Sequence, residues 1–273
     1  MKLMKRFFSF VMCIIFLFSI SAISVYAESP HYSYLLRVGF PSAYLDSLSA
    51  DMILQIYKTI ADKDIYSVDS KTIYLSESNN ISSTYGSISE KSLHLDIITA
   101  EICQKGTTTI TGVFVSASWD WGYARPFMRK TDALAINWDN NIFAFGENTF
   151  LLQEKFKNYK SDGTTTDWQV SQEYTRPTQH CQGGVGFTTR FSQFNDFVGG
   201  SVFFIVDPKI RMRVKSASEW GPSTNFNINY MHNRSPVGIS FSFPIAGGSV
   251  SIQPSNSLYD EAADSYTFRY VAL

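Results

Sequence analysis

Apolar and polar positions alternate with a period of two along most of the chain after residue 64. The clearest example is the segment 209–220, where apolar residues at even positions alternate with basic residues at odd positions. This period is typical of a β-strand with one buried and one wet face. The segments 225–232 and 237–243 repeat it, and further strands are predicted at 93–98, 109–119, 133–139, 149–159, 167–175, 185–191, 201–206, 249–252 and 266–271.

One stretch has a helical period instead. Apolar side chains recur there every three to four residues, at Met52, Ile53, Ile56, Tyr57 and Ile60. Ser49 precedes them and is a suitable N-cap residue. The pattern predicts one amphipathic helix over roughly residues 49–62.

About a dozen short strands separated by Gly, Pro, Asn and Ser turns favour a mainly β fold. We predict an antiparallel β-sandwich with one N-terminal amphipathic helix, and a barrel is the alternative. No linker or change of composition divides residues 65–273. The expected organisation is therefore a signal peptide at 1–27, an N-terminal helical segment at 28–64 and a single β-sandwich domain at 65–273.

The N-terminus has the pattern of an export signal. Three basic residues precede an apolar run at 7–23, and small residues follow at Val25 and Ala27, the two positions that a signal peptidase reads. We expect cleavage after Ala27, which gives a secreted, extracellular protein with no stable membrane anchor. The alternative is an uncleaved anchor, because the run is near the lower length limit of a spanning helix.

Composition and charge exclude some classes of protein and of binding partner. The chain is 44% apolar and 17% charged, which excludes general disorder. Loss of Lys2, Lys5 and Arg6 with the signal leaves 20 cations and 24 anions, a net charge of −4. This balance excludes the strong positive field of a dedicated nucleic-acid binder. The expected partner is an unknown extracellular or cell-envelope ligand.

Cys103 and Cys181 are the two cysteines that follow the predicted signal. In an oxidising compartment two thiols are more often joined than free, so we predict a disulfide between them. The alternative is Cys181 as a catalytic nucleophile. His180 is its neighbour, but adjacent residues of an extended segment point to opposite faces, so His180 is badly placed as its base.

Familiar catalytic and metal motifs are absent from the sequence. None of His31, His94, His180 and His232 has a His or Cys two to five positions away, so no metal site is predicted. HExxH, GxSxG, GxGxxG and P-loop patterns are also missing, and no cofactor is predicted. A glycosidase with two dispersed carboxylates stays open as an alternative.

Trp119, Trp121 and Tyr123 alternate and therefore share one face of an extended segment. Such a stripe is suited to a flat platform for a sugar ring or to a membrane interface. The alternative is a core position, because the apolar residues at 113, 115 and 117 continue the same face.

Three acidic segments, 139–141, 162–163 and 260–264, contain oxygen ligands suited to calcium. Turn chemistry accounts equally well for the first two and a solvated acidic loop for the third.

Residues Trp119-Asp120-Trp121, Pro126 and the run 132–139 resemble a stretch of uncharacterised secreted β-rich proteins of Gram-positive bacteria. The segment from Gly39-Phe40-Pro41 to Leu48 is similar to an N-terminal element of the same proteins. The resemblance implies a bacterial, secreted protein and no particular activity.

The leading hypothesis is a secreted, non-catalytic β-sandwich that binds a ligand at the cell exterior. The export signal, the half-wet strands and the missing catalytic motifs favour it. A secreted hydrolase of wall or glycan polymers is the first alternative, and a membrane-active, pore-forming β-protein is the second.

Overall fold

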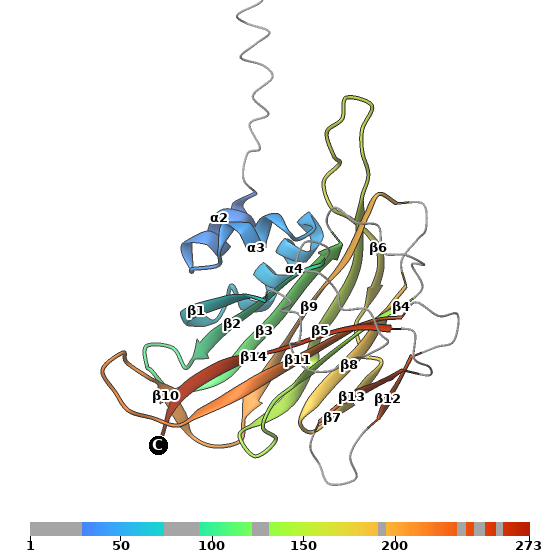
Figure 1. Cartoon of the computed structure of the whole chain (residues 1–273). Coiled ribbons are helices and arrows are strands. Elements are labelled where there is room, and N and C mark those ends of the chain that lie inside the picture. Colours follow the sequence, from blue (N-terminus) through green and yellow to red (C-terminus); the bar gives the residue numbers. More distant parts are fainter. Residues whose placement is uncertain are drawn as a thin grey trace, which may run out of the picture.

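The computed structural model describes residues 29–73, 93–121, 131–190, 195–233, 239–242, 249–254 and 259–273. The predicted signal peptide lies outside these residues. Three short helices, α2 (Pro30–Arg37), α3 (Ser42–Asp46) and α4 (Ala50–Ile60), come first, and β-strands follow (Figure 1). No helix in the described ranges is long and apolar enough to cross a membrane.

The described strands form two six-stranded antiparallel sheets and one two-stranded sheet. The first sheet has the order β1-β2-β3-β9-β5-β6, and the second has the order β10-β14-β11-β4-β8-β7. The strands of the first sheet are β1 (Asp64–Ile73), β2 (Leu93–Cys103), β3 (Ile110–Trp121), β9 (Phe197–Pro208), β5 (Phe143–Lys157) and β6 (Gln169–Tyr174). Those of the second are β10 (Met212–Val214), β14 (Tyr259–Ala272), β11 (Ser223–Asn233), β4 (Thr131–Asn137), β8 (Gly184–Thr189) and β7 (Gln179–Cys181). The small sheet pairs β12 (Ile239–Ser242) with β13 (Ser251–Pro254).

The two large sheets share one apolar core. Odd-numbered residues of β3, including Val113 and Trp119, pack in one cluster with Leu134 of β4, Phe187 of β8 and Tyr230 of β11. The chain is therefore mainly β, with two antiparallel sheets arranged as the two layers of a sandwich.

The three helices cover the outer face of the first sheet (Figure 1). The sequence predicts a helix only at the last of them, α4, where the Ser49 hydroxyl accepts a hydrogen bond from the Met52 amide at 3.0 Å. The apolar residues of the helices pack on even-numbered Phe114 of β3 and on Phe203 of β9. The central strands β2, β3 and β9 of the first sheet are consequently buried on both faces, whereas the edge strand β6 is mostly exposed.

Polar bonds attach this helical layer to the sheet. Ser47 Oγ donates to Ser118 Oγ at 2.9 Å, and Ser49 Oγ donates to Gln153 Oε1 at 2.8 Å. Lys155, which is 1% exposed, donates from Nζ to the Ser47 carbonyl oxygen and to Ser118 Oγ. Burial lowers the pKa of Lys155 to about 8, although Asp120 acts in the opposite direction.

Two strand predictions need correction. The segment 209–220 is extended only over β10, because residues 216–219 form a hydrogen-bonded turn after it. Residues 260–264 lie in β14 and do not form a loop. The sequence also did not predict β1 and β7, each of which lies at one edge of its sheet.

Candidate ligand site at the flank between the two sheets

The aromatic residues singled out from the sequence do not form a surface in the structure. Trp119 and Trp121 are 1% and 4% exposed and lie in the core between the sheets. This position matches the core alternative. Tyr123 lies outside the described residues.

The acidic segments form turns or pair with other side chains. Asp139 accepts hydrogen bonds from the backbone and side chain of Asn141, and Asp162 accepts them from the backbone and side chain of Thr164. Asp264 forms an ion pair with Lys71 at 2.8 Å. Over the described ranges, no group of three His, Cys, Asp or Glu side chains is arranged to hold a metal ion.

The predicted disulfide is not present. Cys103 and Cys181 are both free, the first buried and the second half-buried. They lie in different sheets, because Cys103 ends β2 and Cys181 ends β7, which pairs with β8 among the described strands. Burial raises the pKa of the Cys103 thiol to about 11, with further contributions from Glu101 and Asp64.

We expect alkylation of the native protein to modify Cys181 before Cys103. The thiolate is the reactive form, and the buried Cys103 has both less access and less thiolate. Timed labelling with iodoacetamide, read by peptide mass spectrometry, measures the two rates, and labelling in urea is the control in which they should become similar. A Cys103–Cys181 linked peptide in a non-reducing digest would instead restore the predicted disulfide.

The best-formed candidate site lies between the edges of the two large sheets. A hollow of about 470 Å³ opens there between β1 and β2 on one side and β10 and β14 on the other. Aromatic, hydroxyl, acidic and basic side chains all contribute to its wall. The lining residues are Tyr66, Ser67, Asp69, Thr99, Glu101, Val214, Lys215, Ser216, Ala217, Tyr266, Thr267, Phe268 and Arg269.

Polar pairs hold the walls of this hollow together. Tyr266 of β14 donates its hydroxyl to Asp69 Oδ2 of β1 at 2.8 Å, which joins the two sheets. Ser67 Oγ donates to Glu101 Oε2 at 2.6 Å. Burial raises the pKa values of both Glu101 and Tyr266 above their ordinary ranges. The hollow therefore has a fixed polar floor.

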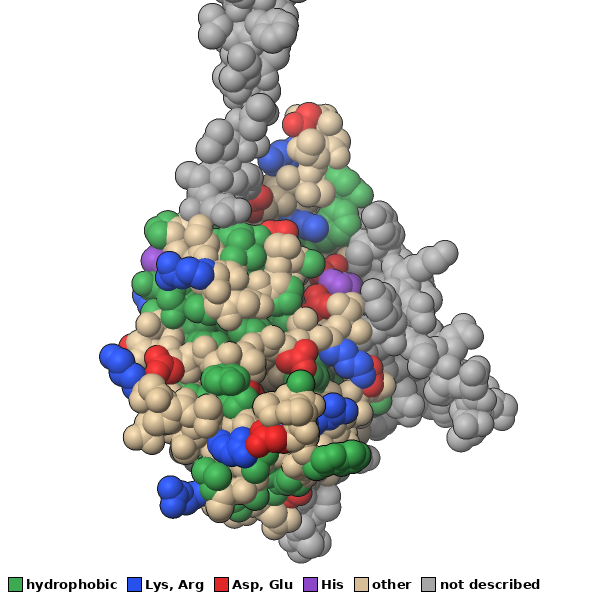
Figure 2. Space-filling view, turned by 90° about the vertical axis from the view of Figure 1, so that its left-hand side faces the viewer, with side chains coloured by type: hydrophobic (Ala, Val, Ile, Leu, Met, Phe, Trp, Pro, Cys, Tyr) green, Lys and Arg blue, Asp and Glu red, His purple; other side chains and the backbone are tan. Residues whose placement is uncertain are grey.

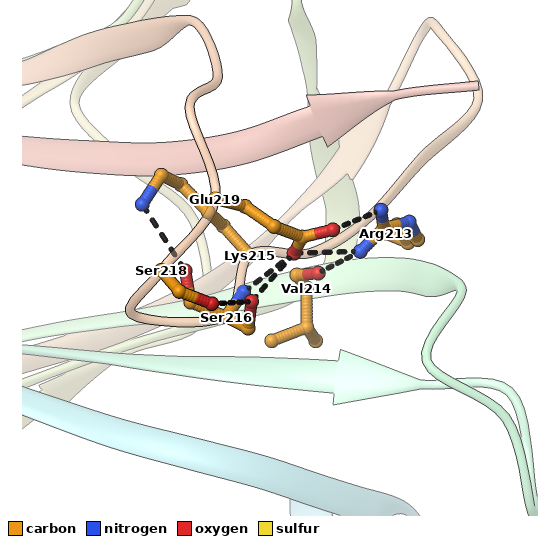
Figure 3. A network of polar contacts seen from close by, with 6 residues as sticks. All are labelled: Arg213, Val214, Lys215, Ser216, Ser218 and Glu219. Carbon is orange, nitrogen blue, oxygen red and sulfur yellow. Dashed lines mark hydrogen bonds and ion pairs between the residues drawn. The ribbon is translucent and has the colours of Figure 1, made fainter.

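The loop after β10 borders the hollow with residues 215–217, and hydrogen bonds to Glu219 stabilise it (Figure 3). Its carboxylate accepts two hydrogen bonds from the Arg213 guanidinium, at 2.5 and 2.9 Å, and two from the amide and hydroxyl of Ser216, each at 2.9 Å. The Arg213 bonds, with those from Ser216, lower the pKa of Glu219 to about 2. Glu219 is therefore ionised at neutral pH, the state in which its carboxylate accepts all of these hydrogen bonds.

Trp220 follows this network and is 99% exposed. Gly221, the next residue, packs so closely on β14 that a Cβ atom would lie 2.3 Å from the Tyr270 carbonyl oxygen. The indole ring thus extends into solvent between two residues that the fold holds in place. Sequence reasoning missed Trp220 by placing it at the end of a strand, although the Gly221-Pro222 pair after it is a turn signal.

Charges on this side of the molecule are mixed. Figure 2 shows cations and anions scattered among apolar side chains, with no large area of one sign. The hollow itself combines Lys215 and Arg269 with Asp69 and Glu101. Such a wall suits a ligand that is polar and uncharged, with donors and acceptors of its own.

No family model matches the chain, and no curated protein matches its sequence. Three solved structures have partial likeness to the fold. BspA_C_mut is 8% identical, with a TM-score of 0.27, and the match covers 67% of this chain and 56% of that one. The structure titled "AvmM Catalyzes Macrocyclization in Alchivemycin A Biosynthesis" is 9% identical, with a TM-score of 0.24 and coverage of 74% and 87%. The xylan-binding module CBM15 is 11% identical, with a TM-score of 0.21 and coverage of 52% and 92%. At these TM-scores the likenesses carry no argument about function, and the chain spans little more than half of the first of these structures.

Proposed function

We propose that the protein is a secreted, non-catalytic β-sandwich module that binds a carbohydrate chain at the flank between its two sheets. The observation that carries the proposal is Trp220, an indole that is 99% exposed. It does not line the hollow itself, but it follows the hydrogen-bonded loop whose residues 215–217 do. Indole faces contribute large contact areas and pack on apolar surfaces such as the faces of sugar rings. The carboxylates and hydroxyls of the hollow supply partners for sugar hydroxyls.

Preorganisation supports binding at this place. The Glu219 network fixes the loop before any ligand arrives, so little conformational entropy is lost on binding. Tyr66, 55% exposed on the opposite wall, offers a second aromatic ring. The two rings and the polar floor together suit a ligand with apolar faces and hydroxyl edges.

Affinity electrophoresis of the mature protein in gels containing xylan, mannan, soluble cellulose derivatives or solubilised peptidoglycan tests this function. Trp220→Ala is expected to weaken binding to the retarding polymer at least tenfold, because a central aromatic anchor commonly contributes about 2 kcal/mol. Tyr159→Ala is the matched control, since Tyr159 is 58% exposed but lies on the β5–β6 connection. Glu219→Ala should give a smaller loss, through loop order alone.

Equal retardation of the Trp220→Ala variant and the wild type would contradict the proposed site, and no retardation by any of these polymers would contradict the proposed function. Assays for new reducing ends in the same mixtures test the hydrolase alternative. If new reducing ends appear, the protein is a hydrolase and not a non-catalytic binding module.

A further inference from the structure

A second hollow, independent of the carbohydrate site, lies between the helical layer and the β5–β6 connection. Its volume is about 630 Å³. Leu45, Leu48 and Ile53 of the helical layer give it an apolar wall, and Lys157 and Trp168 line it from the β5–β6 side. We propose that this hollow binds an oxyanion carried on an apolar body, such as the carboxylate or phosphate of a hydrophobic molecule.

Two lysines meet one tryptophan ring at this hollow. Lys155 Nζ lies 4.7 Å and Lys157 Nζ 4.5 Å from the centre of the Trp168 ring. Lys157 Nζ also lies 5.1 Å from the Phe197 ring. Rings attract these cations but do not neutralise them. The hollow therefore has positive charge on one wall.

Lys155 and Lys157 differ in their burial and in the carboxylates that surround them. Lys155 is buried, with Asp120 and Asp96 close enough to affect it electrostatically. Lys157 is half-buried, and among the described residues no carboxylate lies within ion-pair distance of its Nζ. Asp120 acts electrostatically on Lys157 as well, but without contact. An ammonium with no carboxylate in contact, on the wall of an apolar hollow, is a group to which an anion can add a charge-assisted hydrogen bond.

Asp46 of the helical layer and Asp167 of the β5–β6 connection also line the hollow. Asp46 already accepts a hydrogen bond from the Tyr32 hydroxyl at 2.8 Å, and Asp167 is exposed to solvent. A cationic ligand would compete with two lysines for the Trp168 ring. The lysines at the Trp168 ring therefore favour an anion over a cation in this hollow.

The β5–β6 connection is also held in place. The Thr166 amide donates to the Asn158 carbonyl oxygen at 2.9 Å, and the Tyr159 amide donates to Asp196 Oδ2 at 2.9 Å. Gly163, with φ +82°, makes the turn. Lys157 and Trp168 flank these bonds, so the fold positions both side chains before a ligand enters.

Isothermal titration of the whole protein with octanoate, octyl phosphate and 1-octanol tests the site, because the three probes share one chain and differ in the head group. We expect at least one anionic probe to bind at least tenfold more tightly than 1-octanol. Lys157→Met should remove that advantage. Lys160→Met, which removes an exposed lysine from the same connection, should keep it within twofold.

The head group that binds identifies the source of the anion, a carboxylate or a phosphate. Equal binding of 1-octanol and both anions would overturn the proposal, as would absence of binding at millimolar concentration. Equal losses in Lys157→Met and Lys160→Met would overturn it too, because they would indicate a general charge effect. Trp220→Ala should leave all these affinities unchanged, which separates this site from the carbohydrate site.

Discussion

Replacement of Asp132 by alanine is expected to lower the free energy of unfolding by about 3–5 kcal/mol. Asp132 is 1% exposed and lies at one end of the core, where its carboxylate joins both sheets. Oδ1 is 2.6 Å from His232 Nδ1, and Oδ2 accepts hydrogen bonds from the Tyr230 hydroxyl and from Trp121 Nε1. The substitution removes the acceptor that these three buried groups share.

The loss is large because the partners are buried as well. His232 is 2% exposed and Tyr230 is 1% exposed, so water cannot replace the carboxylate without opening the core. Trp121 keeps a bond to the Tyr230 hydroxyl at 3.1 Å, which limits the effect to the histidine and the tyrosine. Urea unfolding followed by circular dichroism measures the difference.

Asp139→Ala is the control for this experiment, since Asp139 is exposed and bonds only within its own turn. Its effect is expected to stay below about 1 kcal/mol. A change of that small size in the Asp132 variant would show that the network contributes little to stability.

The stability of the wild type should rise with pH relative to that of Lys155→Met, by about 2–3 kcal/mol between pH 8 and pH 10. The folded-state pKa of Lys155 is lowered to about 8 from its ordinary value of 10.5. Between these two values the unfolded chain binds a proton that the folded protein has lost, so unfolding becomes less favourable as pH rises. Below pH 8 the difference between the two proteins should be constant.

Comparison with the variant removes the contribution of other groups. Burial raises the pKa of Tyr44 and Tyr266, and their effect on stability has the opposite sign, a loss that begins as pH passes the ordinary tyrosine value. Both tyrosines are present in both proteins, so this loss cancels. Parallel stability curves from pH 7 to pH 10 would mean that Asp120 and Asp96 keep the ammonium charged. An NMR titration of the Lys155 Cε signal gives the pKa directly if the variant does not fold.

The sequence by itself was enough to predict the β-rich class and most of the strands. Period-two alternation with turn residues marks segments such as β4 and β11 reliably, because one face of each strand enters the core and local chemistry ends it. The helix α4 can be predicted from the sequence for a similar reason, because Ser49 caps a run of apolar residues at helical spacing. These features depend on neighbours in the chain.

The candidate site could not be predicted, because its parts come from separate strands. Trp220 becomes a candidate for ligand binding only once the Arg213–Glu219 pair forms a loop and residues 215–217 of that loop line a hollow between the two sheets. Alternation also assigned residues 209–220 to one strand, since periodicity does not show that Glu219 folds back on Ser216. Side-chain hydrogen bonds of Glu219 with Ser216 and Arg213 decide where the strand ends, and a period-two pattern does not show them.

Only the tertiary structure decided which polar residues are buried. Gln153, Glu154 and Lys155 follow one another in β5, and their sequence is typical of a solvated strand. Their exposures are 1%, 2% and 1%, because the helical layer covers one face of the first sheet and the second sheet covers the other. A strand between two layers has no wet face, so its polar side chains must find partners inside the protein. Alternation reports that a strand has two faces, whereas the packing of distant elements determines what covers each of them.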